Sequence, residues 1–156
     1  GAPIGGYSLA DALGLANDIN MIKAEKKVTA LATATSREKS KLVFARHSVK
    51  PGLSYVIMED VCNNFSTTEE LIALITSGGG KVLAIACFLN RSLSIEDVYR
   101  SASTNCDIPV VSLVRLPIKE WKQDDPAVAD DIARGNVAWK PKDDWDRLMK
   151  AMQVNV

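Results

Sequence analysis

The sequence has no excess of charge of either sign, since 19 lysine and arginine residues balance 19 aspartate and glutamate residues. A protein that binds the nucleic acid backbone or an anionic membrane usually carries a basic excess, so this balance argues against both partners. The apolar runs are short, and those such as 82–89 fall far below the roughly 20 residues that a spanning helix needs. No charged and then apolar leader is present. We therefore expect a cytoplasmic protein that is neither inserted into a membrane nor exported.

Cysteine and histidine are scarce. The three cysteines, Cys62, Cys87 and Cys106, stand 25 and 19 residues apart, and the chain contains one histidine. The absence of a C-x-x-C pair argues against a zinc site, and the odd number of cysteines argues against a disulfide scaffold. The remaining composition, 47% apolar and 24% charged over 156 residues, predicts a single globular domain spanning 1–156. Such a chain buries roughly 70% of its unfolded surface.

Hydrophobic spacing and turn signals predict an α/β fold. A capping box of Thr67 and Glu70 begins a helix that Gly78-Gly79-Gly80 ends. Strand, helix, strand, helix, strand with short connections implies right-handed crossovers and a parallel sheet flanked by helices, and the continuous apolar strand 81–89 implies cover on both faces. The other predicted elements are helices over 7–20, 94–102 and 143–153, a short helix from Asp124-Asp125-Pro126 to Gly135, strands over 21–24, 29–33, 42–45, 54–58 and 108–116, and a polar turn over 36–40.

Two adjacent acids, Glu59 and Asp60, end the predicted strand 54–58, and the polar loop 63–67 leads from them into the next helix. In a parallel α/β sheet, ligands bind beyond the carboxyl ends of the strands, where helix N-termini present free N–H groups to anions. Carboxylates suit sugar hydroxyls or a divalent cation, and hydroxyl and amide donors suit a phosphate. The segment therefore indicates a site for a phosphorylated sugar. The competing interpretations are a solvated acidic turn and a capping loop without a ligand.

From this segment outward, the sequence resembles the type I phosphoribosyltransferases and, among them, the short-loop orotate phosphoribosyltransferases. Their strand ends in two acids and continues V-x-T-T-G-G-S, whereas this chain continues Val61-Cys62-Asn63-Asn64-Phe65-Ser66-Thr67, so the acids match and the loop does not. The match extends from residue 1 to about residue 141. Gly1–Gly6 resemble the diphosphate loop of those enzymes, and Arg46–Gly52 resemble the segment that precedes their acid-bearing strand. Gly78–Val82 and Asn90-Arg91-Ser92 resemble their strand that ends in D-R-S, and Ile108–Leu113 resemble the strand that follows it. Gly135 and Lys140-Pro141 resemble their C-terminal tail.

The resemblance implies an enzyme that transfers the phosphoribosyl group from phosphoribosyl diphosphate to orotate, with magnesium, as a homodimer whose upstream N-terminal part is absent from this chain. Such enzymes stabilise charge and require no nucleophile. Implied for catalysis are Glu59 and Asp60 at the ribose hydroxyls and Arg46 and Lys50 at the diphosphate. Implied for substrate binding are Asn63, Asn64, Phe65, Ser66 and Thr67 around the 5-phosphate, Ala2 and Pro3 in the diphosphate loop, and Arg91 at the orotate carboxylate.

The altered loop leaves alternatives open. Two hydroxyl donors become amides, and a glycine that lets backbone N–H groups approach phosphate becomes Phe65. One alternative is a phosphoribosyltransferase fold that has lost catalysis and binds a nucleotide or phosphorylated sugar for regulation or assembly. Another is transfer to a purine base, which the D-R-S-like segment disfavours. Lys26 and Lys27 fit an ordinary solvated face.

Overall fold

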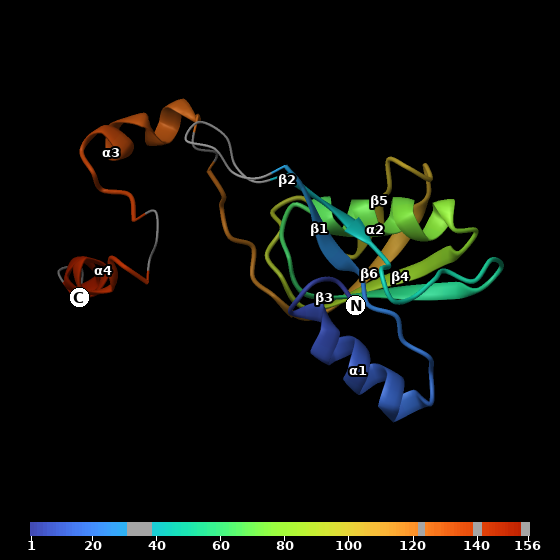
Figure 1. Cartoon of the computed structure of the whole chain (residues 1–156). Helices are drawn as coiled ribbons and strands as arrows, with labels where there is room; N and C mark the ends of the chain where they lie inside the picture. The colour runs from blue at the N-terminus through green and yellow to red at the C-terminus, as the bar shows by residue number, and fades with distance from the viewer. Residues whose placement is uncertain (31–38, 122–123, 139–141, 154–156) are drawn as a thin grey trace. The chain divides into compact units, whose positions relative to one another are not determined.

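The structure is a computed structural model that describes residues 1–30, 39–121, 124–138 and 142–153. The chain divides into two compact units, Gly1–Ile118 and Lys119–Val156, each of which is described by itself. No helix in the described ranges is long and apolar enough to cross a membrane. The single-domain interpretation stays a prediction. The elements in Figure 1 are α1 (Gly6–Asn17), β1 (Glu25–Ala30), β2 (Lys39–Val43), β3 (Ser54–Cys62), α2 (Ser66–Ser77), β4 (Lys81–Asn90), β5 (Val98–Arg100), β6 (Asp107–Arg115), η1 (Pro126–Val128), α3 (Ala129–Ala133) and α4 (Trp145–Gln153).

A four-stranded sheet in the order β3-β4-β6-β5 forms the centre of the first unit. Strands β3, β4 and β6 are parallel, and β5 is antiparallel to β6 at the edge. Helix α2 lies on one side of the sheet and α1 on the other, next to β3 (Figure 1). The α2 side holds the core, where Leu71, Ile72 and Ile75 pack against the apolar residues of the strands. This arrangement confirms the predicted α/β class with a parallel sheet flanked by helices.

The predicted cover on both faces of the sheet is wrong for the described residues. Along β4 and β6, buried Cys87 and Val110 alternate with Phe88, 51% exposed, and Val111, 59% exposed. Successive side chains of a strand point to opposite faces, so the exposed residues lie on the face away from α2. In the described residues, α1 covers this face only beside β3. A continuous apolar strand therefore does not by itself show that both faces are buried.

The predicted helix over 94–102 is also wrong, because this segment bends and then forms β5. The Nδ2 of Asn90, which is completely buried, donates to the carbonyl oxygens of Ile95 at 3.0 Å and Glu96 at 3.1 Å. The Ser92 hydroxyl accepts hydrogen bonds from the backbone N–H groups of Ser94 and Ile95. These side chains satisfy the backbone groups that a helix would use, a competition for which serine and asparagine are well suited.

Replacement of Asn90 by aspartate, the residue of the D-R-S motif, is expected to destabilise the protein by roughly 1–3 kcal/mol. The Asn90 amide donates to two carbonyl oxygens, whereas a carboxylate has no proton to donate and would face both oxygens while buried. Urea denaturation measures the difference. The exposed Asn17→Asp serves as the control, since the Asn17 amide donates only to the Leu13 carbonyl on the surface of α1. Equal free energies of unfolding for the two variants would contradict this account of the loop.

The segment between α1 and β3 forms an antiparallel hairpin of β1 and β2. The predicted strand over 21–24 is wrong, since the Ala24 N–H donates to the Gly1 carbonyl instead of to a neighbouring strand. Parts of the predicted strand 29–33 and polar turn 36–40 lie outside the described residues. Leu42 of β2 is buried in the core, and its N–H donates to the Glu70 carboxylate.

The second unit contains the helices predicted near the C-terminus. The Asp125 carboxylate accepts a hydrogen bond from the Ala127 N–H at 2.9 Å and so caps the turn that begins at Pro126. Gly135 has a φ of 70°, the left-handed backbone that commonly follows the end of a helix. Helix α4 confirms the predicted terminal helix, and its Trp145 is 58% exposed.

Candidate functional site

The two acids lie at the C-terminal end of β3, as the sequence predicts, but within the strand rather than after it. Glu59 is 7% exposed and Asp60 is exposed. Burial, and then the charge of Asp60, raise the pKa of Glu59 to about 7, against an opposing effect of Lys26. The pair therefore combines a carboxyl that titrates near neutrality with a carboxylate open to solvent.

The glycine-rich segment Gly1–Gly6 packs directly on these acids. The Ala2 N–H donates to the Met58 carbonyl at 2.9 Å, and Ala2 is completely buried. A β-carbon on Gly5 would lie 1.8 Å from Asp60 Oδ2, and one on Gly6 would lie 2.2 Å from the Met58 oxygen. Both contacts are far shorter than packed atoms allow, so only glycine permits this approach. The structure thus brings Ala2 and the glycines of the sequence-predicted loop to Glu59 and Asp60.

Replacement of Glu59 by glutamine tests the raised pKa. The folded state holds a proton on Glu59 up to a pH of about 7, whereas the ordinary pKa of a glutamate carboxyl is 4.5. Because the folded state binds more protons between these values, Glu59 makes the wild type less stable as the pH rises through this window. Glu59→Gln is therefore expected to gain up to roughly 3 kcal/mol relative to wild type between pH 4 and pH 8. Urea denaturation at several pH values measures this.

The matched control is Glu96→Gln, since the Glu96 side chain is 72% exposed and pairs with Arg115 at 3.6 Å. Its stability difference from wild type should stay nearly constant across the same window. Parallel stability curves for Glu59→Gln and wild type would show that the Glu59 carboxyl is ionised in the folded state at an ordinary pH.

The loop 63–67 leads from β3 into α2 and lines a cavity of about 100 Å³ together with Glu59. Phe65 precedes the first residue of α2 with a φ of 58°, and no side chain caps this end of the helix. The predicted capping box of Thr67 and Glu70 is wrong, since Glu70 binds the Leu42 N–H instead. The Asn64 Oδ1 accepts a hydrogen bond from the Ser66 N–H at 3.0 Å.

Arg91 lies immediately beside this loop. Its backbone N–H donates to the Cys62 carbonyl at 2.9 Å, because Asn90 and Cys62 are partners in the parallel pairing of β3 and β4. Its side chain is partly buried, and its Nε is buried without a hydrogen-bond partner among the described residues. The structure therefore places Arg91 next to the loop, at the same edge of the sheet as the two acids.

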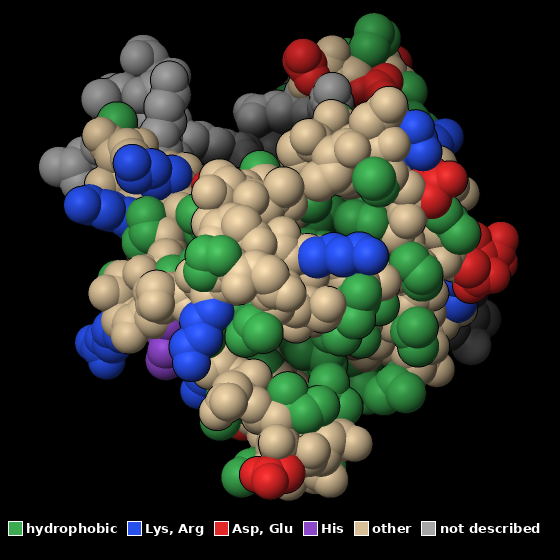
Figure 2. Space-filling view, turned by 90° about the vertical axis from the view of Figure 1, so that its right-hand side faces the viewer, with side chains coloured by type: hydrophobic (Ala, Val, Ile, Leu, Met, Phe, Trp, Pro, Cys, Tyr) green, Lys and Arg blue, Asp and Glu red, His purple; other side chains and the backbone are tan. Residues whose placement is uncertain are grey.

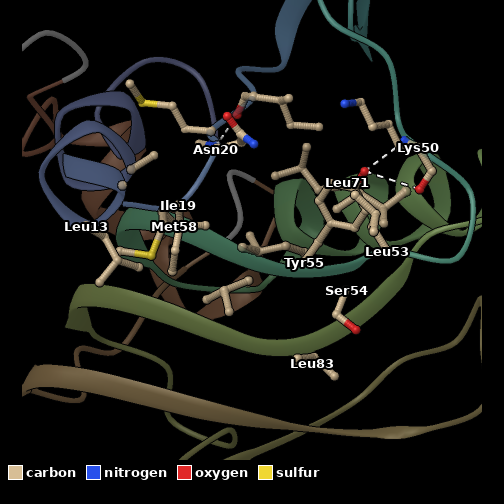
Figure 3. Close-up of a pocket in the computed structure, with 18 of the residues that line it drawn as sticks. Leu13, Ile19, Asn20, Lys50, Leu53, Ser54, Tyr55, Met58, Leu71 and Leu83 are labelled. Atoms are coloured by element: carbon tan, nitrogen blue, oxygen red, sulfur yellow. Dashed lines mark hydrogen bonds between the residues drawn. The ribbon is translucent and has the colours of Figure 1, made fainter. Parts of the chain in front are cut away.

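Lys50 does not lie beside the acids. It precedes β3, and its backbone N–H donates to the Tyr55 hydroxyl at 2.8 Å. Ser54 and Glu59 lie roughly 16 Å apart along the extended strand, so Lys50 stands at the opposite end. There it lines a larger cavity of about 430 Å³ whose walls include Leu13, Ile19, Leu53 and Met58 (Figure 3). On the face of the molecule that Figure 2 shows, hydrophobic side chains (green) lie close to one another.

Arg46 follows β2, is 85% exposed at its side chain, and lies 3.7 Å from a carboxylate oxygen of Glu25. Sequence reasoning missed Lys26, which lies in β1, is exposed, and opposes the rise in the pKa of Glu59 through its charge. The sequence pattern of Lys26 and Lys27 predicts only a solvated face. The influence of Lys26 on Glu59 depends on the folding of the first unit, in which the hairpin and β3 both lie, so no local motif identifies Lys26.

Comparisons with known proteins agree with the sequence resemblance. No protein-family model matches the chain. An orotate phosphoribosyltransferase from Acidithiobacillus ferrooxidans is 30% identical over 89 residues, which are 56% of this chain and 42% of that protein. The chain thus matches less than half the length of this curated relative.

The fold has solved counterparts. An adenine phosphoribosyltransferase from Rhodothermus marinus superposes with a TM-score of 0.54 at 19% identity, covering 74% of this chain and 67% of that chain. An orotate phosphoribosyltransferase from Aeropyrum pernix superposes with a TM-score of 0.50 at 15% identity, covering 74% and 58%. The predicted resemblance is therefore confirmed, and the fold is that of the type I phosphoribosyltransferases.

Proposed function

We propose that this chain is part of an orotate phosphoribosyltransferase-like enzyme that transfers a phosphoribosyl group from phosphoribosyl diphosphate to orotate. The carrying observation is the contact between the glycine-rich loop and the acid-bearing end of β3, where Gly5 meets Asp60 and Gly6 meets Met58. This contact brings together a backbone segment that a diphosphate can approach and carboxylates that can bind ribose hydroxyls. The name of the matched relative, an orotate phosphoribosyltransferase, supports the choice of reaction.

The residues of the site have distinct proposed roles. Glu59 and Asp60 accept hydrogen bonds from the ribose hydroxyls, and the loop 63–67 binds the 5-phosphate in the cavity that it lines. Lys26 and Arg46, both exposed, neutralise charge that develops on the departing diphosphate, and Arg91 binds the base. Preorganised charges of this kind stabilise an oxocarbenium-like sugar without a covalent intermediate. Lys50, which stands at the other end of β3, has no role in this arrangement.

The donor set fits magnesium that is bound together with the diphosphate. No group of three or more histidine, cysteine or acidic side chains able to hold a metal occurs among the described residues. Magnesium in phosphate-transfer sites commonly uses one or two protein carboxylates and takes its other ligands from phosphates and water. Asp60, which is exposed beside the glycine loop, is the residue that would contribute such a carboxylate. The bound cation would neutralise charge on the leaving diphosphate.

Titration of phosphoribosyl diphosphate with magnesium, followed by an assay of transfer to orotate, uracil, adenine and hypoxanthine, tests the proposal. We expect binding and a preference for orotate. Transfer to a purine alone would replace orotate by the alternative base class. Absence of phosphoribosyl diphosphate binding would contradict the proposed function.

Light scattering tests the expected homodimer, for which the exposed Trp121 and Trp145 offer apolar surface.

The second candidate is a protein that binds a nucleotide or phosphorylated sugar without catalysis. The rebuilt loop favours it, since Phe65 replaces a glycine and buries its ring, and Asn63 and Asn64 replace hydroxyl donors. Binding of phosphoribosyl diphosphate without transfer to any base would support this candidate over the enzyme.

A further inference from the structure

The loop 63–67, which we assign to the 5-phosphate, contacts strand β5. Phe65 is 2% exposed and belongs to the hydrophobic core. The ring stacks on that of Tyr99 in β5, with centroids 5.0 Å apart and planes inclined by 12°. Phe65 also has a φ of 58°, a left-handed conformation that bulky residues rarely adopt. The stacking therefore accompanies the unusual backbone at the point where α2 begins.

A hydrogen-bond network joins the same strand to the first turn of α2. The Tyr99 hydroxyl donates to Glu69 Oε2 at 2.7 Å. The other oxygen of Glu69 accepts from the Ser103 N–H at 2.7 Å and from the Ser101 hydroxyl at 3.2 Å. Partial burial tends to raise the pKa of Glu69, but hydrogen bonds from Ser103, Tyr99 and Ser101 outweigh it and lower the pKa. Glu69 is thus held as a carboxylate between β5 and α2.

Tyr99 is the residue common to both contacts. Its ring supports Phe65, and its hydroxyl supports Glu69, whose own N–H donates to the Phe65 carbonyl at 2.8 Å. The two contacts bracket Ser66, Thr67 and Thr68, which line the cavity beside Glu59. A loop with two glycines can adopt a left-handed turn without such contacts, whereas the loop 63–67 contains no glycine.

We infer that Tyr99 is a positioning residue that holds the loop 63–67 in a phosphate-binding conformation, through the Phe65 ring on one side and Glu69 on the other. The inference rests on the proposed function, because it concerns the phosphate site of that function. Tyr99 does not line this cavity, so its effect on a ligand acts through the backbone of residues 65–69. The altered loop sequence and the tyrosine of β5 are then parts of one arrangement.

Isothermal titration with ribose 5-phosphate and, separately, with magnesium diphosphate tests the inference. Tyr99→Leu, which removes the stacking and the hydroxyl, should weaken ribose 5-phosphate binding at least tenfold. Tyr99→Phe, which keeps the stacking, should weaken it severalfold. Diphosphate binding should change less than twofold in both variants, because that ligand is assigned to the glycine-rich loop. The control is Arg100→Ala, in the same strand as Tyr99, which removes an ion pair of 3.1 Å with Asp107 of β6 and should leave both affinities unchanged.

Unchanged ribose 5-phosphate binding in Tyr99→Leu and Tyr99→Phe would overturn the positioning role while leaving the proposed function intact. Equal weakening of both ligands in the two variants would also overturn it, since general loosening of the fold would explain that result. Failure of the wild type to bind either ligand would contradict the proposed function and, with it, this inference.

Discussion

Exchange of both acids for amides, Glu59→Gln together with Asp60→Asn, is expected to abolish stabilisation of the protein by phosphoribosyl diphosphate. At a ligand concentration one hundred times the dissociation constant, the wild type should gain about 2.7 kcal/mol in its free energy of unfolding. The double variant should gain almost nothing, because the ribose loses both carboxyl groups beside the glycine loop. Thermal or urea unfolding with and without ligand measures the gain.

The amides preserve the size of both side chains, and loss of the Glu59 charge removes a buried ionised group above pH 7. The variant should therefore fold, so a lost ligand effect would not reflect unfolding. A matched control is the adjacent acid pair Glu96→Gln with Asp97→Asn, which stands outside the cavity of the loop 63–67. A full ligand effect in the Glu59 and Asp60 variant would show that these acids do not bind the ribose.

The parallel core of the fold could be predicted from the sequence because its signals are local. Strands β3, β4 and β6 are apolar runs bounded by turns, and α2 shows helical apolar spacing that ends at glycines. The place of Glu59 and Asp60 follows from the same rule, since residues at the carboxyl ends of parallel strands meet at one edge of the sheet.

The details that failed depend on contacts between distant segments. Strand β5 replaces a predicted helix because the buried Asn90 amide binds the carbonyls of Ile95 and Glu96, and a sequence pattern does not show where a side chain points. The burial of Phe65 depends on Tyr99, 34 residues later in the chain. Lys26 of β1 influences Glu59 of β3 only in the folded first unit, which contains both strands. The charges of Lys26 and Lys27 alone are typical of a solvated strand.

Replacement of Arg91 by alanine is expected to cost roughly 2–5 kcal/mol in orotate binding, the effect of removing one partner from a desolvated charge pair. The Arg91 Nε is buried and has no hydrogen-bond partner among the described residues, so a ligand carboxylate would satisfy a donor that the folded chain leaves unpaired. The measurement is the KM for orotate at saturating phosphoribosyl diphosphate. Uracil, which has no carboxylate, should be used equally by the variant and the wild type.

The affinity for phosphoribosyl diphosphate should stay nearly intact in Arg91→Ala, although Arg91 adjoins the phosphate loop. Its hydrogen bond to the Cys62 carbonyl comes from the backbone N–H, which alanine retains. Arg91→Lys supplies a further test, since lysine keeps the charge but lacks the planar pair of donors that matches a carboxylate, and should recover only part of the orotate affinity. Parallel loss of both ligands in Arg91→Ala would indicate a structural role. Unchanged use of orotate would remove Arg91 from the base site and with it the residue-level reason for choosing orotate over a purine base.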